Sequence, residues 1–181
     1  MRIFNDDRWE MSEEAINLGD YHPWKWHKIR GGTRDNYDKH SGLILDLKDN
    51  YESAIAHFMD ILDKAIASGV SLTFVPSHDA TKKTSGIRQL VRILAGRNAR
   101  QDATDCIIRT KTVPKLSKGG GREIQVHLDS LKIINPEKVR GRAYLIIDDV
   151  TTTGNSLEAC KRLFIEAGAA KVRALVLGKT V

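Results

Sequence analysis

The sequence predicts an α/β protein with an open, mainly parallel, twisted sheet flanked by helices. From residue 43 onward, short apolar runs alternate with longer stretches whose apolar residues recur at helical spacing. The runs at 143–147 and 172–177 are continuously apolar, as in strands that are buried on both faces. This alternation implies parallel strands joined by right-handed crossovers, with helices on both faces of the sheet.

The expected elements follow one another closely along the chain. Strands are predicted at 43–47, 72–75, 106–108, 143–147 and 172–177. Helices are predicted at 51–68, 84–96 and 155–167, because each of these stretches carries one apolar stripe. Gly69 and Gly168 are well placed to end the first and the last of these helices. Residues 110–142 interrupt the pattern with glycines and basic side chains, and we expect a basic loop there.

The composition limits the class of protein. The chain has 181 residues, of which 41% are hydrophobic and 29% are charged, as in an ordinary globular domain. Cys106 and Cys160 lie in apolar segments, which indicates buried thiols in a reducing cytoplasm. No apolar run reaches the length of a membrane span, and the acidic N-terminus has no apolar core of signal-peptide length. We therefore expect a cytoplasmic protein without membrane contact.

The net charge is mildly basic, at +6 with a pI near 9.4. One interpretation is an anionic partner, either a phosphorylated small molecule or nucleic acid. The simpler one is a solvated, lysine-rich surface. Charge alone does not decide between them.

The most informative segment follows the predicted strand 143–147. Asp148 and Asp149 leave the strand end side by side, and a turn rich in hydroxyl groups leads into a helix. The residues of this turn and of the helix start are Thr151, Thr152, Thr153, Gly154, Asn155 and Ser156. A helix N-terminus binds phosphate through free N–H groups and its dipole, and a glycine permits close backbone approach. The two carboxylates suit nearby sugar hydroxyls, so the segment predicts a site for a phosphorylated sugar.

A simpler interpretation of the same segment is structural. Asp148 and Asp149 would then cap the following helix, and the threonines would be turn residues. Acidic pairs also follow strands in receiver domains, although there they lie near the N-terminal strand. Four apolar residues, two aspartates, three threonines and a glycine in one run are more specific than an acidic pair alone.

Residues 145–157 resemble the 13-residue signature of type I phosphoribosyltransferases. The resemblance implies that fold, with Asp148 and Asp149 binding the ribose hydroxyls of 5-phosphoribosyl-1-pyrophosphate. It also implies that the residues from Thr151 to Ser156 hold the 5′-phosphate. Members of the hypoxanthine type have an aspartate at the position of Thr152, and its absence here argues against that subgroup.

A second resemblance, over about residues 70–178, is to the ComF-like (competence-protein-like) subgroup of the same family. It rests on a proline after the first core strand, on Gly86, Ile87, Arg88 and Gln89 entering a helix, and on the acidic segment. Arg88 stands where that subgroup usually has asparagine, and the four-cysteine zinc ribbon is absent. Functions tied to the ribbon are therefore not expected.

The resemblance also assigns the pyrophosphate side of the site. The loop after residues 72–75 would hold pyrophosphate, and its candidate binding residues are Pro76, Ser77, His78, Lys82 and Lys83. His78 could be an acid–base group, although a histidine in a polar loop is more often a bystander. Residues 111–122 resemble the family's lid, with Lys118 and Arg122 as the candidate catalytic cations. A basic, glycine-rich loop is equally a candidate nucleic-acid contact.

Residues 1–42 form a candidate hood before the 43–181 domain. Related enzymes use such a hood to select the base, and Trp24, Trp26 or Tyr37 could stack on it, or could simply seal the sheet edge. The implied cofactor is Mg²⁺, bound as the complex with phosphoribosyl pyrophosphate and without dedicated protein ligands. The expected function is phosphoribosyl transfer to a nitrogenous base. The alternative is a non-catalytic sensing module, with nucleic acid or a second copy of the chain as candidate partners.

Overall fold

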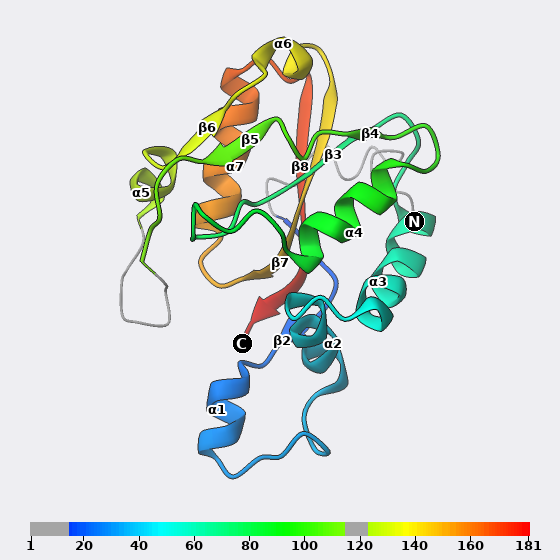
Figure 1. Ribbon diagram of the computed structural model, residues 1–181, viewed down its shortest axis with the longest axis vertical. Helices are drawn as coiled ribbons and strands as arrows, with labels where there is room; N and C mark the ends of the chain where they lie inside the picture. The colour runs from blue at the N-terminus through cyan, green and yellow to red at the C-terminus, as the bar shows by residue number, and fades with distance from the viewer. Residues whose placement is uncertain (1–14, 115–122) are drawn as a thin grey trace.

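The central sheet confirms the predicted fold class (Figure 1). The computed structural model describes residues 15–114 and 123–181. The strands of this sheet are β1 (Ile16–Asn17), β2 (Asp20–Tyr21), β3 (Ser71–Phe74), β4 (Gln101–Asp102), β7 (Ala143–Thr151) and β8 (Lys171–Thr180). Their order is β1-β8-β7-β3-β4, with β2 also paired to β8, and every pairing is parallel.

Helices cover both faces of the sheet, because alternate side chains of each strand point to opposite sides. Leu145 and Ile147 of β7 pack with α2 (Lys39–Lys48), α3 (Glu52–Ala65) and α4 (Gly86–Ala95) on one face. Tyr144 and Ile146 pack on the other face against α7 (Asn155–Glu166), whose inner side includes Cys160 and Phe164. In Figure 1 the α3–α4 pair and α7 lie on opposite sides of the strands. The predicted helices are therefore confirmed within a few residues at their ends.

The segment 110–142 is more regular than the sequence predicted. Within its described part it contains α5 (Ile124–Leu128), β6 (Leu131–Ile133) and α6 (Pro136–Val139), so the prediction of a loop throughout is wrong. β6 pairs antiparallel with β5 (Ile107–Arg109), which lies outside the main sheet. The strand predicted at 106–108 exists, but it belongs to this small hairpin. The elements were missed because each is shorter than the window in which periodicity can be detected.

The strand predicted at 43–47 is also wrong, because these residues lie within α2. The Asp38 side chain accepts a hydrogen bond from the Ser41 backbone N–H at 2.7 Å, which caps the helix. Ile44 and Leu47, three residues apart, face the core and are fully buried. A five-residue apolar run does not distinguish a strand from a buried helical turn.

The N-terminal segment docks on the edge of the main sheet. β1 and β2 extend it along β8, so backbone pairing rather than tryptophan packing covers that edge. α1 (Trp24–Ile29) lies at one end of the molecule in Figure 1. Trp24 packs edge-on against Tyr37, with ring centres 4.9 Å apart, and Trp26 is exposed. Across residues 15–114 and 123–181, no helix is long and apolar enough to cross a membrane.

Candidate active site

The acidic pair lies within the last four residues of β7 (Ala143–Thr151), which continues past the predicted strand end at residue 147, and Asp148 is in register with Val176 of β8. Asp148 is 8% exposed, and its Oδ1 accepts a hydrogen bond from the Asp149 backbone N–H at 2.9 Å. Burial and the neighbouring Asp149 charge raise the pKa of Asp148 well above its ordinary value. Asp149 is more open, and its Oδ1 lies 3.4 Å from Nζ of Lys48. The pair thus combines one buried and one accessible carboxyl group.

The turn after the pair builds an anion-binding geometry. Gly154 has a φ of 78°, a left-handed conformation that favours glycine, and it stands at the N-cap of α7. Beside it is a cavity of about 430 Å³, which the hydroxyl-rich turn shares with two lysines. The lining residues include Thr151, Thr152, Thr153, Gly154, Asn155, Lys161 and Lys179. The backbone N–H groups at the start of this 12-residue helix, together with Lys179, favour a phosphate, whereas Glu158 also lines the cavity and pairs with Lys161 at 3.6 Å. Ser156 lies in the first turn of α7 outside this lining set.

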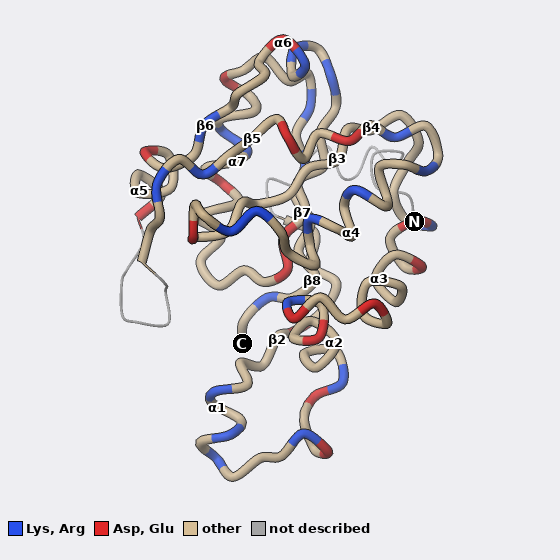
Figure 2. Tube along the Cα trace, viewed as in Figure 1, with Lys and Arg blue, Asp and Glu red and all other residues tan. Residues whose placement is uncertain are grey.

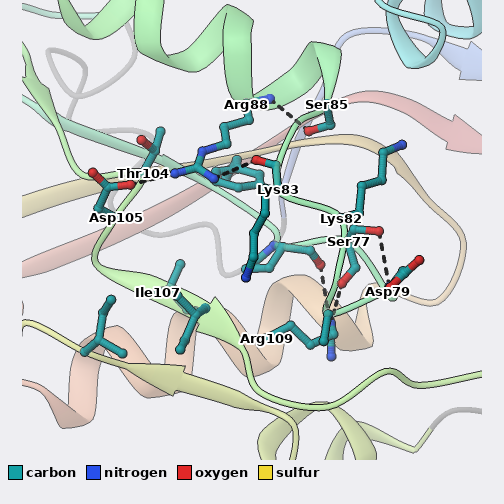
Figure 3. Close-up of a pocket in the computed structure, with 15 residues that line it drawn as sticks. Ser77, Asp79, Lys82, Lys83, Ser85, Arg88, Thr104, Asp105, Ile107 and Arg109 are labelled. Carbon is teal, nitrogen blue, oxygen red and sulfur yellow. Dashed lines mark hydrogen bonds and ion pairs between the residues drawn. The ribbon is translucent and has the colours of Figure 1, made fainter.

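The candidate pyrophosphate loop borders a second cavity of about 240 Å³, shown in Figure 3. Pro76, Ser77, Lys82 and Lys83 line it, whereas His78 does not. In Figure 3, Lys83 extends into the space between Arg88 and Ile107, and Lys82 points away from it. The predicted binding residues that line a cavity therefore fall into two cavities rather than one, and Asp148, Asp149, His78 and Ser156 line neither of them.

The backbone of this loop is largely occupied by its own contacts. The amides of Asp79 and Thr81 donate to Ser77 Oγ and Asp79 Oδ1, at 3.2 and 2.9 Å. The amides of Ala80 and Lys82 donate to Thr112 Oγ1 and the Asp79 carbonyl, at 3.1 and 3.2 Å. Bonds from Thr81 lower the pKa of the Asp79 carboxyl. In this conformation the loop can contact an anion through its lysine side chains rather than through these amides.

Arg109 is a site residue that the sequence did not reveal. It is buried, and it donates from Nε to the Ser77 carbonyl at 2.6 Å and from NH2 to the Pro76 carbonyl at 3.3 Å. Its NH1 donates to Ser130 Oγ at 2.5 Å. Its charge also acts to lower the pKa of Asp148, against the larger effect of burial. Arg109 thus connects the candidate pyrophosphate loop to the β5–β6 hairpin. The available signal in the sequence was a single basic residue at the end of the apolar strand Ile107–Arg109.

Arg88, the departure from the asparagine of the ComF-like pattern, has a clear structural role. Its NH2 lies 2.6 Å from Asp105 Oδ1, and its NH1 donates to the Lys83 carbonyl at 2.8 Å. Its guanidinium lies over the Phe74 ring, 5.7 Å from the centre. Arg88 therefore ties the end of the pyrophosphate loop to the segment before β5.

The two candidate lid cations, Lys118 and Arg122, lie outside the described residues. Within residues 15–114 and 123–181, no cluster of three or more histidine, cysteine, aspartate or glutamate residues is placed to hold a metal ion. Two residues that the sequence did not single out, Lys48 and Tyr21, lie beside Asp149.

Comparisons with known proteins agree with the fold. Residues 89–179, half of the chain, match the family model of the phosphoribosyl transferase domain. The chain is also similar to an adenine phosphoribosyltransferase of Nocardia farcinica (strain IFM 10152), with 49% identity over 43 residues. That match spans 24% of this chain and 22% of the relative. The family match, with the parallel sheet and the loop between β7 and α7, shows that the chain belongs to the phosphoribosyltransferase family and has the type I fold.

Proposed function

We propose that this protein transfers a phosphoribosyl group from 5-phosphoribosyl-1-pyrophosphate to a nitrogenous base or a similar nucleophile. The supporting observation is the Asp148–Asp149 pair at the end of β7, directly before a helix N-terminal cavity lined by hydroxyl groups and lysines. The carboxylates would accept hydrogen bonds from the ribose hydroxyls. The turn from Thr151 to Ser156 would hold the 5′-phosphate.

The chemical step needs charge stabilisation more than proton transfer. The bond from ribose C1 to pyrophosphate breaks, its electron pair leaves with the pyrophosphate, and C1 becomes cation-like until the acceptor nitrogen bonds to it. An acceptor N–H gives up its proton to water or to the departing pyrophosphate. Carboxylates fixed near the sugar stabilise the positive charge, and cations near the leaving group stabilise the negative charge. Lys82 and Lys83, with Lys118 and Arg122 from the proposed lid, are the candidate partners of the pyrophosphate. His78 has no required part in this step.

Magnesium fits this scheme as part of the substrate. We propose that Mg²⁺ is held largely by oxygens of the substrate and of water. Such an ion would neutralise charge on the departing pyrophosphate.

The named relative makes adenine the first base to test as acceptor. Membership of the ComF-like subgroup remains part of the proposal, and so does a homodimer. The buried, free thiols of Cys106 and Cys160 support a cytoplasmic location.

Replacement of Asp149 by asparagine is expected to weaken binding of phosphoribosyl pyrophosphate about 10- to 100-fold, the value of a hydrogen bond to a charged group. Isothermal titration with and without Mg²⁺ measures this, and melting of the variant checks that the fold is intact. Asp60→Asn is the matched control, because Asp60 is exposed on α3 and pairs only with Lys64 among the described ion pairs. If the wild type binds no phosphoribosyl pyrophosphate, or if Asp149→Asn binds it equally well, the proposed function is wrong.

A nucleic-acid-associated module is the second candidate. It is favoured by α1, whose side chains are not buried and which carries Lys25 and Lys28 at the projecting end of the molecule (Figure 2). Exposed Trp26 lies beside Lys25, whose Nζ is 5.6 Å from its ring centre. Cations with an exposed aromatic ring suit single strands.

This candidate predicts binding to a single-stranded oligonucleotide that weakens as salt rises. Lys25→Ala with Lys28→Ala is expected to reduce the slope of log affinity against log salt by about 0.7 per lost phosphate contact. Fluorescence anisotropy across a salt series measures the slope. Binding that is absent, or that does not respond to salt, rules out this function for α1.

A further inference from the structure

Lys48 connects the N-terminal part of the chain to the acidic pair. It is the last residue of α2, and its Nζ lies 3.4 Å from Asp149 Oδ1. The side chains of Lys48 and Asp149 are 36% and 25% exposed, so the pair is less screened by solvent than a surface ion pair. The same Nζ lies 5.3 Å from the centre of the Tyr21 ring. The ammonium is thus held between an aromatic face and a carboxylate.

The fold determines this position through backbone pairing. Tyr21, in β2, is in register with Thr180 of β8, and its side chain is buried. Gly178 of β8 makes the approach of β2 and α2 feasible, because a Cβ there would lie 2.8 Å from Tyr21 Cβ and 2.7 Å from Ile44 Cδ1. Tyr21 and Lys48 therefore reach Asp149 from two separate elements that dock on the same strand.

The groups that face the acidic pair come from several elements. Lys48 approaches from α2 and Arg109 from β5, and the neutral groups are Tyr21 of β2 and Cys160 of α7. Arg109 is engaged by the carbonyls of Pro76 and Ser77. Among the ion pairs of the described residues, Lys48 contacts the pair through Asp149. Two adjacent carboxyl groups, one of them buried, favour retaining a proton unless a cation offsets their repulsion.

We propose that Lys48 is a positioning residue that favours the charged form of the Asp148–Asp149 pair and orients it to accept hydrogen bonds from the sugar hydroxyls, with Tyr21 holding its ammonium in place. The proposal rests on the function proposed above. Loss of Lys48 should weaken binding of phosphoribosyl pyrophosphate more at low pH than at high pH. Without Lys48, the pKa of Asp148 rises further because a cation that lowers it is removed, so the fully charged pair is lost first at the acidic end of the working range and is restored as pH increases.

The test compares Lys48→Met with Lys48→Arg. At a pH below the titration of the pair, Lys48→Met is expected to bind phosphoribosyl pyrophosphate about tenfold more weakly than the wild type, which corresponds to a shift of about one pKa unit. The ratio of wild-type to variant affinity should approach unity as the titrations are repeated from about pH 6 to about pH 9. Lys48→Arg retains the charge and should recover most of the affinity. Lys64→Met is the control, because Lys64 pairs with Asp60 on the exposed side of α3.

A second measurement keeps this proposal separate from the function on which it rests. Carbon-13 NMR of the aspartate carboxyl groups follows titration of the pair in the free protein, and Lys48→Met should shift it to higher pH. If the wild type fails to bind the sugar phosphate but the shift is present, the proposed function fails while the role of Lys48 in charging the pair stands. Equal titration curves overturn the proposal. So does a loss of affinity that is the same at every pH, because that indicates only a structural role.

Discussion

Replacement of Arg100 by methionine is expected to lower the free energy of unfolding by about 3 kcal/mol or more, because several buried carbonyl groups would lose their donor. The Arg100 side chain is 0% exposed and lies at the end of α3. It donates to the carbonyls of Asp63, Ile66, Ala67 and Leu94, and its NH1 lies 2.6 Å from Asp63 Oδ1. The last carbonyls of a helix have no partner within it, and here one buried guanidinium supplies it.

Chemical denaturation of the variant, compared with Arg97→Met, isolates this effect. Arg97 also pairs with Asp63, at 3.2 Å, but its side chain is 50% exposed, so its loss should cost less than about 1 kcal/mol. Hydrogen bonds from Arg100 lower the pKa of Asp63 below its ordinary value of 3.8. The stability linked to Asp63 is therefore present above that value and is lost as pH falls below it. The difference in free energy of unfolding between wild type and Arg100→Met should become smaller as pH falls. Equal free energies of unfolding at neutral pH would contradict the capping role.

The part of the site that the sequence predicted is encoded locally. The strand β7, the turn and the start of α7 are contiguous, so the pattern of apolar, acidic and hydroxyl residues determines their order and their geometry together. Gly154 and Gly168 were recognisable for the same reason, because each takes a positive φ at a helix end. The predicted turn residues Thr151 to Asn155 do line one cavity.

The residues that were missed depend on contacts between distant parts of the chain. Lys48 lies 101 positions before Asp149 and reaches it only because β2 and α2 dock on β8. Arg109 contacts loop carbonyls 32 and 33 positions earlier. These contacts join residues far apart in the sequence, so no local pattern marks either side chain. The incorrect prediction of a strand at 43–47 also reflects tertiary contacts. The short apolar run allows a strand or a helix, and burial of Ile44 and Leu47 against the rest of the core favours the helix.

Gly86→Ala tests why the motif from Gly86 to Gln89 begins with a glycine. Gly86 begins α4, and a Cβ there would overlap the carbonyl oxygen of Leu47 and lie 2.9 Å from its carbonyl carbon. Because the obstacle is backbone, no side-chain rotation can relieve it. We expect a loss of about 3 kcal/mol, the upper part of the range for overpacking, in chemical denaturation.

The same substitution should also disturb the site, because Leu47 directly precedes Lys48 at the end of α2. If α2 moves to make room, Lys48 leaves Asp149, and folded Gly86→Ala should bind phosphoribosyl pyrophosphate more weakly, in the manner of Lys48→Met. Gly42→Ala is the matched control: it lies within α2, its Cβ would meet only Tyr37 Cδ1 at 3.7 Å, and alanine favours the helix by up to about 1 kcal/mol. A Gly86→Ala protein as stable as Gly42→Ala would show that α2 and α4 do not pack this closely, and that the position of Lys48 does not depend on this glycine.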